Sequence, residues 1–169
     1  IKLGAQHHWV SFLGRVENGQ IYVGTMAGEV FINQNHIANF IPFYSFASNR
    51  VTTISHIHNN IWIGFDNMNE SGGIVVVGSD RKLVKSYRKE YHGDKHIPSN
   101  RVRKIVKRKN GEIWIGSAEG LAVIDSIGIH YIDQKQPFNG LPHISIHDLY
   151  VDHNDGVWVG TWSGGLAYY

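Results

Sequence analysis

The stretch Ile113-Trp114-Ile115-Gly116-Ser117 decides the fold, because the chain contains it in four versions. Each version places an aromatic residue between two β-branched residues and follows them with glycine. The other three versions are Ile21–Thr25, Ile61–Phe65 and Val157–Thr161. Self-similarity at a spacing of roughly 40 to 50 residues is typical of a solenoid, a propeller or another repeat array. The chain is therefore predicted to consist of four copies of one structural unit.

The sequence around each motif predicts four short antiparallel strands per unit. In the third unit an apolar segment, Val102–Val106, precedes Asn110-Gly111, and such a pair between apolar runs is a strong signal for a β-hairpin. The second unit turns at residues 58–60 without glycine, where an asparagine is expected to take the left-handed conformation. A third strand follows each motif, and a weaker fourth strand follows in the first three units. The expected third and fourth strands are Gly28–Ile32, Gly73–Val77, Gly120–Ile124 and Gly165–Tyr169, then about Ile37–Ile41, Lys82–Tyr87 and Ile129–Ile132.

Many of the expected strands, such as Ile74–Val77, are apolar on both faces. Burial of both faces is expected where further sheets pack on each side. A four-stranded unit of this length, stacked radially, is a β-propeller blade, whereas a linear solenoid suits four antiparallel strands poorly. The predicted fold class is all-β, with about four propeller blades. Their expected bounds are about 9–41, 50–87, 101–133 and 144–169, and residues 1–4 are a candidate outer strand of a neighbouring blade.

Composition excludes several classes of protein. The 169 residues carry a formal net charge of only +2, which gives no reason to expect nucleic acid or an anionic membrane as a partner. The run Arg101–Lys109 holds six cations; a polyanion site and the solvated face of a strand are both open, and the second is the commoner case. No apolar run approaches the ~18 residues of a membrane span. The chain begins with Ile1 rather than methionine, which we interpret as a piece of a longer protein whose targeting and membrane segments lie elsewhere.

The sequence predicts no metal, no cofactor and no catalytic residues. There are eleven histidines and no cysteine, but no carboxylate accompanies the histidines at recognisable metal-ligand spacing. Nucleophile-elbow, phosphate-loop and zinc-protease motifs are all absent from the sequence. A paired-carboxylate glycosidase site stays open, because such pairs converge in space rather than in sequence.

Segments 97–125 and 141–169 resemble the two-component regulator propeller repeat. That pattern runs Leu-Pro, an apolar strand, Asp-x-x-Gly, an Ile-Trp-Ile-Gly-Thr-like strand, and then Gly-Leu. The third and fourth units match it closely. The first departs from it at Tyr22 and Glu29, and the second departs in its turn without glycine and in the long link Asp66–Gly72.

The resemblance implies an extracytoplasmic sensor. Such repeats build the periplasmic sensor region of hybrid two-component histidine kinases, above all in gut Bacteroidetes, where two seven-bladed propellers precede a β-sandwich, a membrane helix and the kinase. Members of that family detect oligosaccharides and control genes for carbohydrate utilisation. The implied chain is a non-enzymatic periplasmic segment of an inner-membrane protein. Its implied partners are an oligosaccharide, the remaining blades or a second propeller of the receptor, and a second receptor copy in a homodimer; contact with the membrane would be made only through a segment absent here.

Two arrangements of the four blades are compatible with the sequence. They can form an arc of a seven-bladed ring, or a small closed ring in which Ile1-Lys2-Leu3 supplies the strand missing after Tyr169. We favour the arc. An arc leaves two apolar blade faces to be covered by other parts of a protein.

Function is expected where the copies differ, because the repeated residues are explained by packing between blades. In propellers the link between the second and third strands and the link between blades emerge on one face. The longest such links are Asp66–Gly72, Arg88–Asn100 and Gln134–His143. Loops on a rigid scaffold commonly carry binding residues, and sugars require amides or carboxylates together with an aromatic face. The candidate ligand-binding residues are Asp66, Asn67, Asn69, Glu70, Tyr91, His92, Asp94, His96 and Trp162.

Three alternatives remain open for these links and for the function. The links can serve only to pack against missing parts of the receptor. The propeller can be a protein-interaction scaffold, or it can be a glycan hydrolase or lyase.

Overall fold

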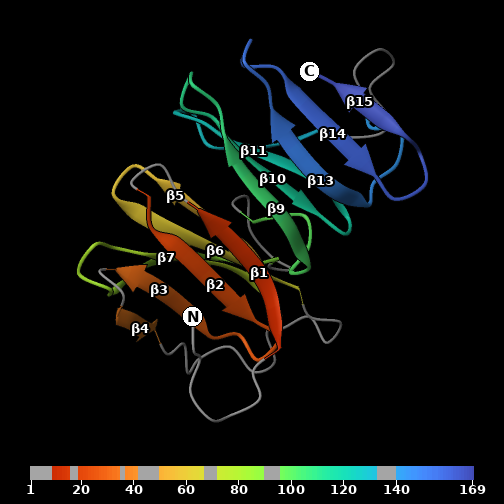
Figure 1. Cartoon of the computed structure of the whole chain (residues 1–169). Coiled ribbons are helices and arrows are strands. Elements are labelled where there is room, and N and C mark those ends of the chain that lie inside the picture. The colour runs from red at the N-terminus through yellow and green to blue at the C-terminus, as the bar shows by residue number, and fades with distance from the viewer. Residues whose placement is uncertain are drawn as a thin grey trace.

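The computed structural model of the chain describes residues 9–15, 19–34, 37–41, 50–66, 72–89, 96–132 and 140–169. These residues form four antiparallel sheets that follow one another along the chain (Figure 1). Each sheet is a simple meander in which every strand pairs with its neighbour in sequence. The all-β prediction is confirmed, and the sheets have the arrangement of propeller blades.

The strands are short, and each blade starts with its inner strand. Blade 1 contains β1 (Val10–Arg15), β2 (Ile21–Thr25), β3 (Val30–Gln34) and β4 (Ile37–Ile41). Blade 2 contains β5 (Arg50–Ile57), β6 (Asn60–Asp66), β7 (Gly73–Val77) and β8 (Leu83–Tyr87). Blade 3 contains β9 (Val102–Lys107), β10 (Ile113–Ser117), β11 (Gly120–Ile124) and β12 (Ile129–Ile132). Blade 4 contains β13 (Ile146–Val151), β14 (Val157–Thr161) and β15 (Leu166–Tyr168).

The hairpin turns after the inner strands use positive φ angles. Gly19 and Gly111 take φ of 80° and 98° in blades 1 and 3, as their Asn-Gly pairs predict. In blade 2 the expectation that an asparagine would take this conformation is wrong, because His58 has φ of 54°. Ile57 pairs directly with Asn60, so the loop has two residues and its first residue bears the positive φ, as in a type II′ turn.

The core lies between consecutive blades, which explains why the strands are apolar on both faces. Side chains alternate across a strand, and in β10 Ile113 and Ile115 pack against blade 2 whereas Trp114 packs toward blade 4. In β6, Ile63 packs toward blade 1 and Trp62 toward blade 3. The prediction that the motif tryptophans pack between blades is confirmed for Trp62 and Trp114.

The inner strands β1, β5 and β9 are joined by hydroxyl groups. Ser11 Oγ donates to the carbonyl of Val51 at 2.7 Å, and Thr52 Oγ1 donates to that of Val102 at the same distance. Between β9 and β13 the link is an ion pair, with Lys104 Nζ 3.1 Å from an Asp148 carboxylate oxygen. The four inner strands therefore line one edge of the stacked blades, with β1 and β13 at its two ends (Figure 1).

The outer faces of blades 1 and 4 are open to solvent. Leu13 in blade 1 and Leu166 in blade 4 are both exposed. The motif tryptophan of blade 4, Trp158, is 39% exposed, whereas Trp114 is 4% exposed. The described blades therefore form an arc, as expected from the sequence; the alternative closure through Ile1–Leu3 involves residues outside those described.

Glu112, at the turn before β10, is expected to make the free energy of unfolding depend on pH. It accepts hydrogen bonds from Trp114 Nε1 at 3.0 Å and Arg108 Nη1 at 2.8 Å. The bond from Trp114, with help from Arg108, holds the pKa of Glu112 below its ordinary value of 4.5. A carboxyl group whose pKa is lowered by folding stabilises the fold above its unfolded pKa, and this contribution is lost as the pH falls through the folded pKa.

We expect Glu112→Gln to lower the free energy of unfolding at pH 7 by up to about 1 kcal/mol and to reduce the loss of stability below pH 4.5. Urea unfolding followed by circular dichroism at neutral and acidic pH measures both effects. Parallel pH profiles for the variant and the wild type would contradict this role of the carboxylate.

Candidate functional site

Two of the three predicted links, Asp66–Gly72 and Arg88–Asn100, have described ends that lie together at one end of blade 2. Gly73 N donates to the carbonyl of Asn100 at 2.7 Å, and Lys89 N donates to the side-chain oxygen of Asn100 at 2.7 Å. The described ends of the two links are therefore in contact, which agrees with their predicted emergence on one face. Six of the predicted ligand contacts lie outside the described residues. These are Asn67, Asn69, Glu70, Tyr91, His92 and Asp94.

Asp66, the last residue of β6, is held by two arginines. Its carboxylate oxygens lie 3.0 Å from Arg101 Nε and 2.9 Å from Arg103 Nη1, and its side chain is 8% exposed. A buried carboxylate needs such partners, because desolvation of an unpaired charge is costly. Asp66 thus positions two cations at the start of β9, and its predicted contact with a ligand stays a prediction.

Arg103 lines a cavity of about 200 Å³ where the inner strands begin. The cavity is also lined by Arg50, Asp148 and His147. Trp162 lies beside it, since its ring meets that of His147 edge-on, with centroids 5.5 Å apart. Its side chain is 71% exposed. An exposed aromatic ring next to cations and a carboxylate has the groups that a sugar ring and its hydroxyls require.

His96 lies in a different cavity, of about 280 Å³, at the outer part of blade 3. Tyr131 donates its hydroxyl to the main-chain carbonyl of His96 and lies 2.8 Å from His96 Nδ1. Burial raises the pKa of Tyr131 above its ordinary value of 10.0, so the hydroxyl stays a donor at neutral pH. The exposed Ile144 adds an apolar wall. The sequence had placed Tyr131 only in a weak outer strand, so this partner was missed.

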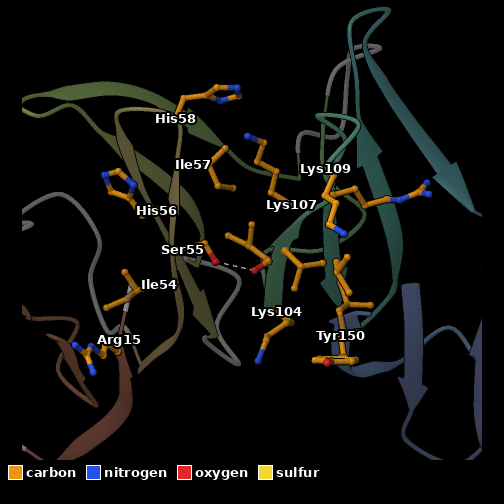
Figure 2. Close-up of a pocket in the computed structure, with 15 residues that line it drawn as sticks. Arg15, Ile54, Ser55, His56, Ile57, His58, Lys104, Lys107, Lys109 and Tyr150 are labelled. Carbon is orange, nitrogen blue, oxygen red and sulfur yellow. Dashed lines mark hydrogen bonds between the residues drawn. The ribbon is translucent and has the colours of Figure 1, made fainter. Parts of the chain in front are cut away.

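A third and larger cavity lies at the opposite end of the inner strands and has a volume of about 620 Å³ (Figure 2). The 200 Å³ cavity contains Arg50 and Thr52 from the start of β5, whereas this one contains Ile57 and the following His58. No candidate residue had been placed here, and the one sequence signal for it was the basic run Arg101–Lys109. The basic side chains that line it are Arg15, His56, His58, Lys104, Lys107, Arg108 and Lys109.

Among the described residues no group of three or more histidine, aspartate and glutamate side chains could hold a metal ion. His56 and His58 line the large cavity without a carboxylate beside them in its wall. The described ranges also contain no helical segment capable of spanning a membrane.

The chain is similar in fold to several solved structures. The extracellular domain of a putative hybrid two component system of B. thetaiotaomicron superimposes with a TM-score of 0.75 at 23% identity, over 100% of this chain and 21% of its own. A second such domain from B. thetaiotaomicron gives 0.70 at 24% identity, over 95% and 21%. Virginiamycin B lyase from Staphylococcus aureus, in a catalytically inactive form with quinupristin, gives 0.68 at 14% identity, over 100% and 58%. The chain thus spans about a fifth of the length of the two extracellular domains.

Fold and repeats together define a β-propeller protein in which this chain supplies a succession of blades. Residues 96–119 and 140–163 match the family model of the two component regulator propeller. The chain therefore carries two-component regulator propeller repeats, in the third and fourth of its blades. Curated protein sequences include no match to the chain.

Proposed function

We propose that this chain is an extracytoplasmic ligand-sensing segment of a hybrid two-component histidine kinase and response regulator. The match of residues 96–119 and 140–163 to two-component regulator propeller repeats carries the proposal. The likeness in fold to two extracellular domains of putative hybrid two component systems supports it. The segment then lies in the periplasm, attached to the inner membrane through another part of the receptor.

The proposed ligand is an oligosaccharide derived from glycan breakdown. The 200 Å³ cavity supports this class of ligand, since Trp162 offers an exposed ring beside its residues Arg50, Asp148 and His147. Asp66 and His96, two of the site residues expected from the sequence, are proposed to contact the ligand as well. The segment itself performs no chemistry in this proposal, and its other blades come from the remainder of the receptor.

Signalling by such a segment requires a ligand that distinguishes two arrangements of the receptor. An oligosaccharide that binds one arrangement of a receptor dimer more tightly shifts the population toward it, by as much as the difference in binding free energy. The kinase on the other side of the membrane then responds to the arrangement and not to the sugar. Genes for carbohydrate utilisation are the proposed output.

We expect Trp162→Ala to weaken oligosaccharide binding roughly tenfold, the loss typical of an aromatic anchor at an interface. Isothermal titration of the intact receptor ectodomain with a library of glycan-derived oligosaccharides measures it. Tyr168→Ala is the matched control, because it removes an exposed ring from β15 away from the three cavities.

The same titration separates the rival functions. Binding without turnover supports a sensor, whereas release of a cleaved product would make the chain part of a propeller hydrolase or lyase. If no saccharide binds, a protein-interaction scaffold becomes the better explanation. Equal losses in Trp162→Ala and Tyr168→Ala would contradict the placement of the site.

A further inference from the structure

The 620 Å³ cavity at the far end of the inner strands is built by three blades and the edge of a fourth. Strands β5, β9 and β13 form its walls, and Arg15 at the end of β1 closes one side (Figure 2). Ser55 Oγ donates to the carbonyl of Ile105 at 2.7 Å and fixes the separation of two of these walls. A cavity of this volume lies within the range of small-ligand sites, roughly 300 to 1,000 Å³.

The walls carry a concentrated positive charge. Among the described residues that line the cavity none is an aspartate or glutamate, whereas five are lysine or arginine and two are histidine. Some of this charge is compensated from outside the walls. Lys104 pairs with Asp148 at 3.1 Å, and Arg108 pairs with Glu112 at 2.8 Å.

Arg15 and Lys107 are not compensated in this way. Within the described ranges neither side chain has a carboxylate in ion-pair distance. Both are exposed, and both line the cavity from different blades. Like charges held around one concave surface raise the local potential and concentrate anions there.

The cavity also offers an apolar and aromatic wall. Tyr150 on the β13 side supplies most of this surface, since its side chain is largely exposed, whereas Ile54 and Ile57 on the β5 side are almost fully buried behind the wall (Figure 2). A simple inorganic anion would leave this surface uncovered. A ring whose C–H face packs on Tyr150 and whose substituents carry negative charge would use both kinds of wall.

We propose that this inner-strand cavity binds an acidic oligosaccharide through its sulfate or uronate carboxylate groups. The saccharide class rests on the proposed sensor function, whereas the requirement for negative charge rests on the cavity alone. Arg15 and Lys107 contact the anionic groups, and Tyr150 contacts the face of a sugar ring. The restricted volume and the overall charge of only +2 favour a short acidic saccharide over nucleic acid. The basic run of β9 thus lines a binding site in addition to forming a strand.

The test compares a charged and an uncharged form of one saccharide, together with a saccharide that carries carboxylates in place of sulfates. A sulfated dextran hexasaccharide, the uncharged dextran hexasaccharide and a hexagalacturonate are titrated calorimetrically into the intact protein at low and at moderate salt. We expect binding of the sulfated or the galacturonate ligand, none of the uncharged one, and an affinity that falls as salt rises because ions screen exposed charges. Binding by one charged ligand alone identifies sulfate or carboxylate as the recognised group.

The double variant Arg15→Gln/Lys107→Gln should weaken that binding about five- to tenfold, as expected for two exposed ion pairs. The control Lys82→Gln/Lys85→Gln removes the same charge at and before the outer strand β8 and should leave the affinity unchanged. Tyr150→Ala gives a third readout, since it should weaken the charged saccharides but not the binding of inorganic sulfate.

Several results would overturn the inference. Equal affinity in the two double variants would show that the cavity is not the site. Binding of inorganic sulfate alone would reduce it to a simple anion site, and tighter binding of a DNA hexanucleotide would assign it to nucleic acid. Binding of the uncharged saccharide, undiminished in Arg15→Gln/Lys107→Gln, would leave the sensor function standing and contradict only this site. Failure of the three probes would contradict this site, and failure of the whole oligosaccharide library would contradict the sensor function as well.

Discussion

Trp114→Ala is expected to lower the free energy of unfolding by about 3–5 kcal/mol, the cost of deleting a large buried aromatic side chain. Trp114 is 4% exposed and packs into the core between blades 3 and 4. Its ring lies 5.6 Å from that of Tyr169, and its Nε1 donates to Glu112. The substitution therefore removes apolar contact on both sides of one blade interface and leaves a carboxylate with one partner fewer. Urea unfolding followed by circular dichroism measures the change.

Trp158→Ala is the control within the same motif. Trp158 occupies the equivalent strand position in blade 4, but it is 39% exposed, and its principal aromatic neighbour is Tyr168 at 4.6 Å. We expect Trp158→Ala to lower the free energy of unfolding by less than about half as much as Trp114→Ala, because much of the Trp158 side chain already contacts water. Equal costs would show that the tryptophan stabilises its own sheet and not the contact with the next blade.

Gly116→Ala is expected to lower the free energy of unfolding by about 1–3 kcal/mol, the usual cost of forcing an extra carbon into a packed core. A Cβ at this position would lie 2.6 Å from Ile146 Cγ2 and 3.3 Å from Leu149 Cδ1. Both neighbours are buried at the start of blade 4. Since a β-branched residue such as Ile146 cannot turn away without losing its own packing, the inner strand β13 has to move. Urea unfolding again provides the measurement.

Gly160→Ala is the matched control, because Gly160 occupies the same position in the motif of blade 4. A Cβ there would lie 3.7 Å from the Asp148 carbonyl oxygen, and within the described part of the chain no side chain comes within 4 Å of it. We expect the free energy of unfolding to stay the same or to rise by up to about 1 kcal/mol, because alanine lowers the entropy of the unfolded chain. A loss as large as that of Gly116→Ala would contradict the assignment of this glycine to the contact between blades.

These pairs of residues show how far the sequence predicts the fold. Residues 22, 62, 114 and 158 share one strand face with the glycines two positions later, because side chains alternate along a strand. The expected third strand Gly120–Ile124 and fourth strand Ile129–Ile132 agree with β11 and β12. The prediction that an asparagine takes the positive φ in blade 2 was wrong for a local reason. The hairpin loop has two residues, and its first residue, His58, bears the positive φ.

The candidate site was less accessible to sequence reasoning. That the links near Asp66 and Asn100 emerge at one end follows from the order of the strands, and the structure shows their described ends in contact. The partners of Asp66 did not follow, because a carboxylate in a polar link gives no sign of whether it faces water or an arginine. Tyr131 was missed for a similar reason, since a lone tyrosine in a weak strand carries no pattern.

By itself, the sequence determined the repeat, the all-β blades and the residues that face each interface, because these depend on a local period of two within strands and on a recurring motif. Only the tertiary structure decided which distant residues meet. Arg15, Lys107 and Tyr150 come from three different blades and line one cavity. Their convergence depends on how the blades stack around a common edge, which is set by the packing of Val102 on Gly64 and of Ile146 on Gly116. The spacing of the motifs along the chain predicts that the blade is repeated. The angle between blades is set by side-chain packing between them, and the sequence pattern does not give it.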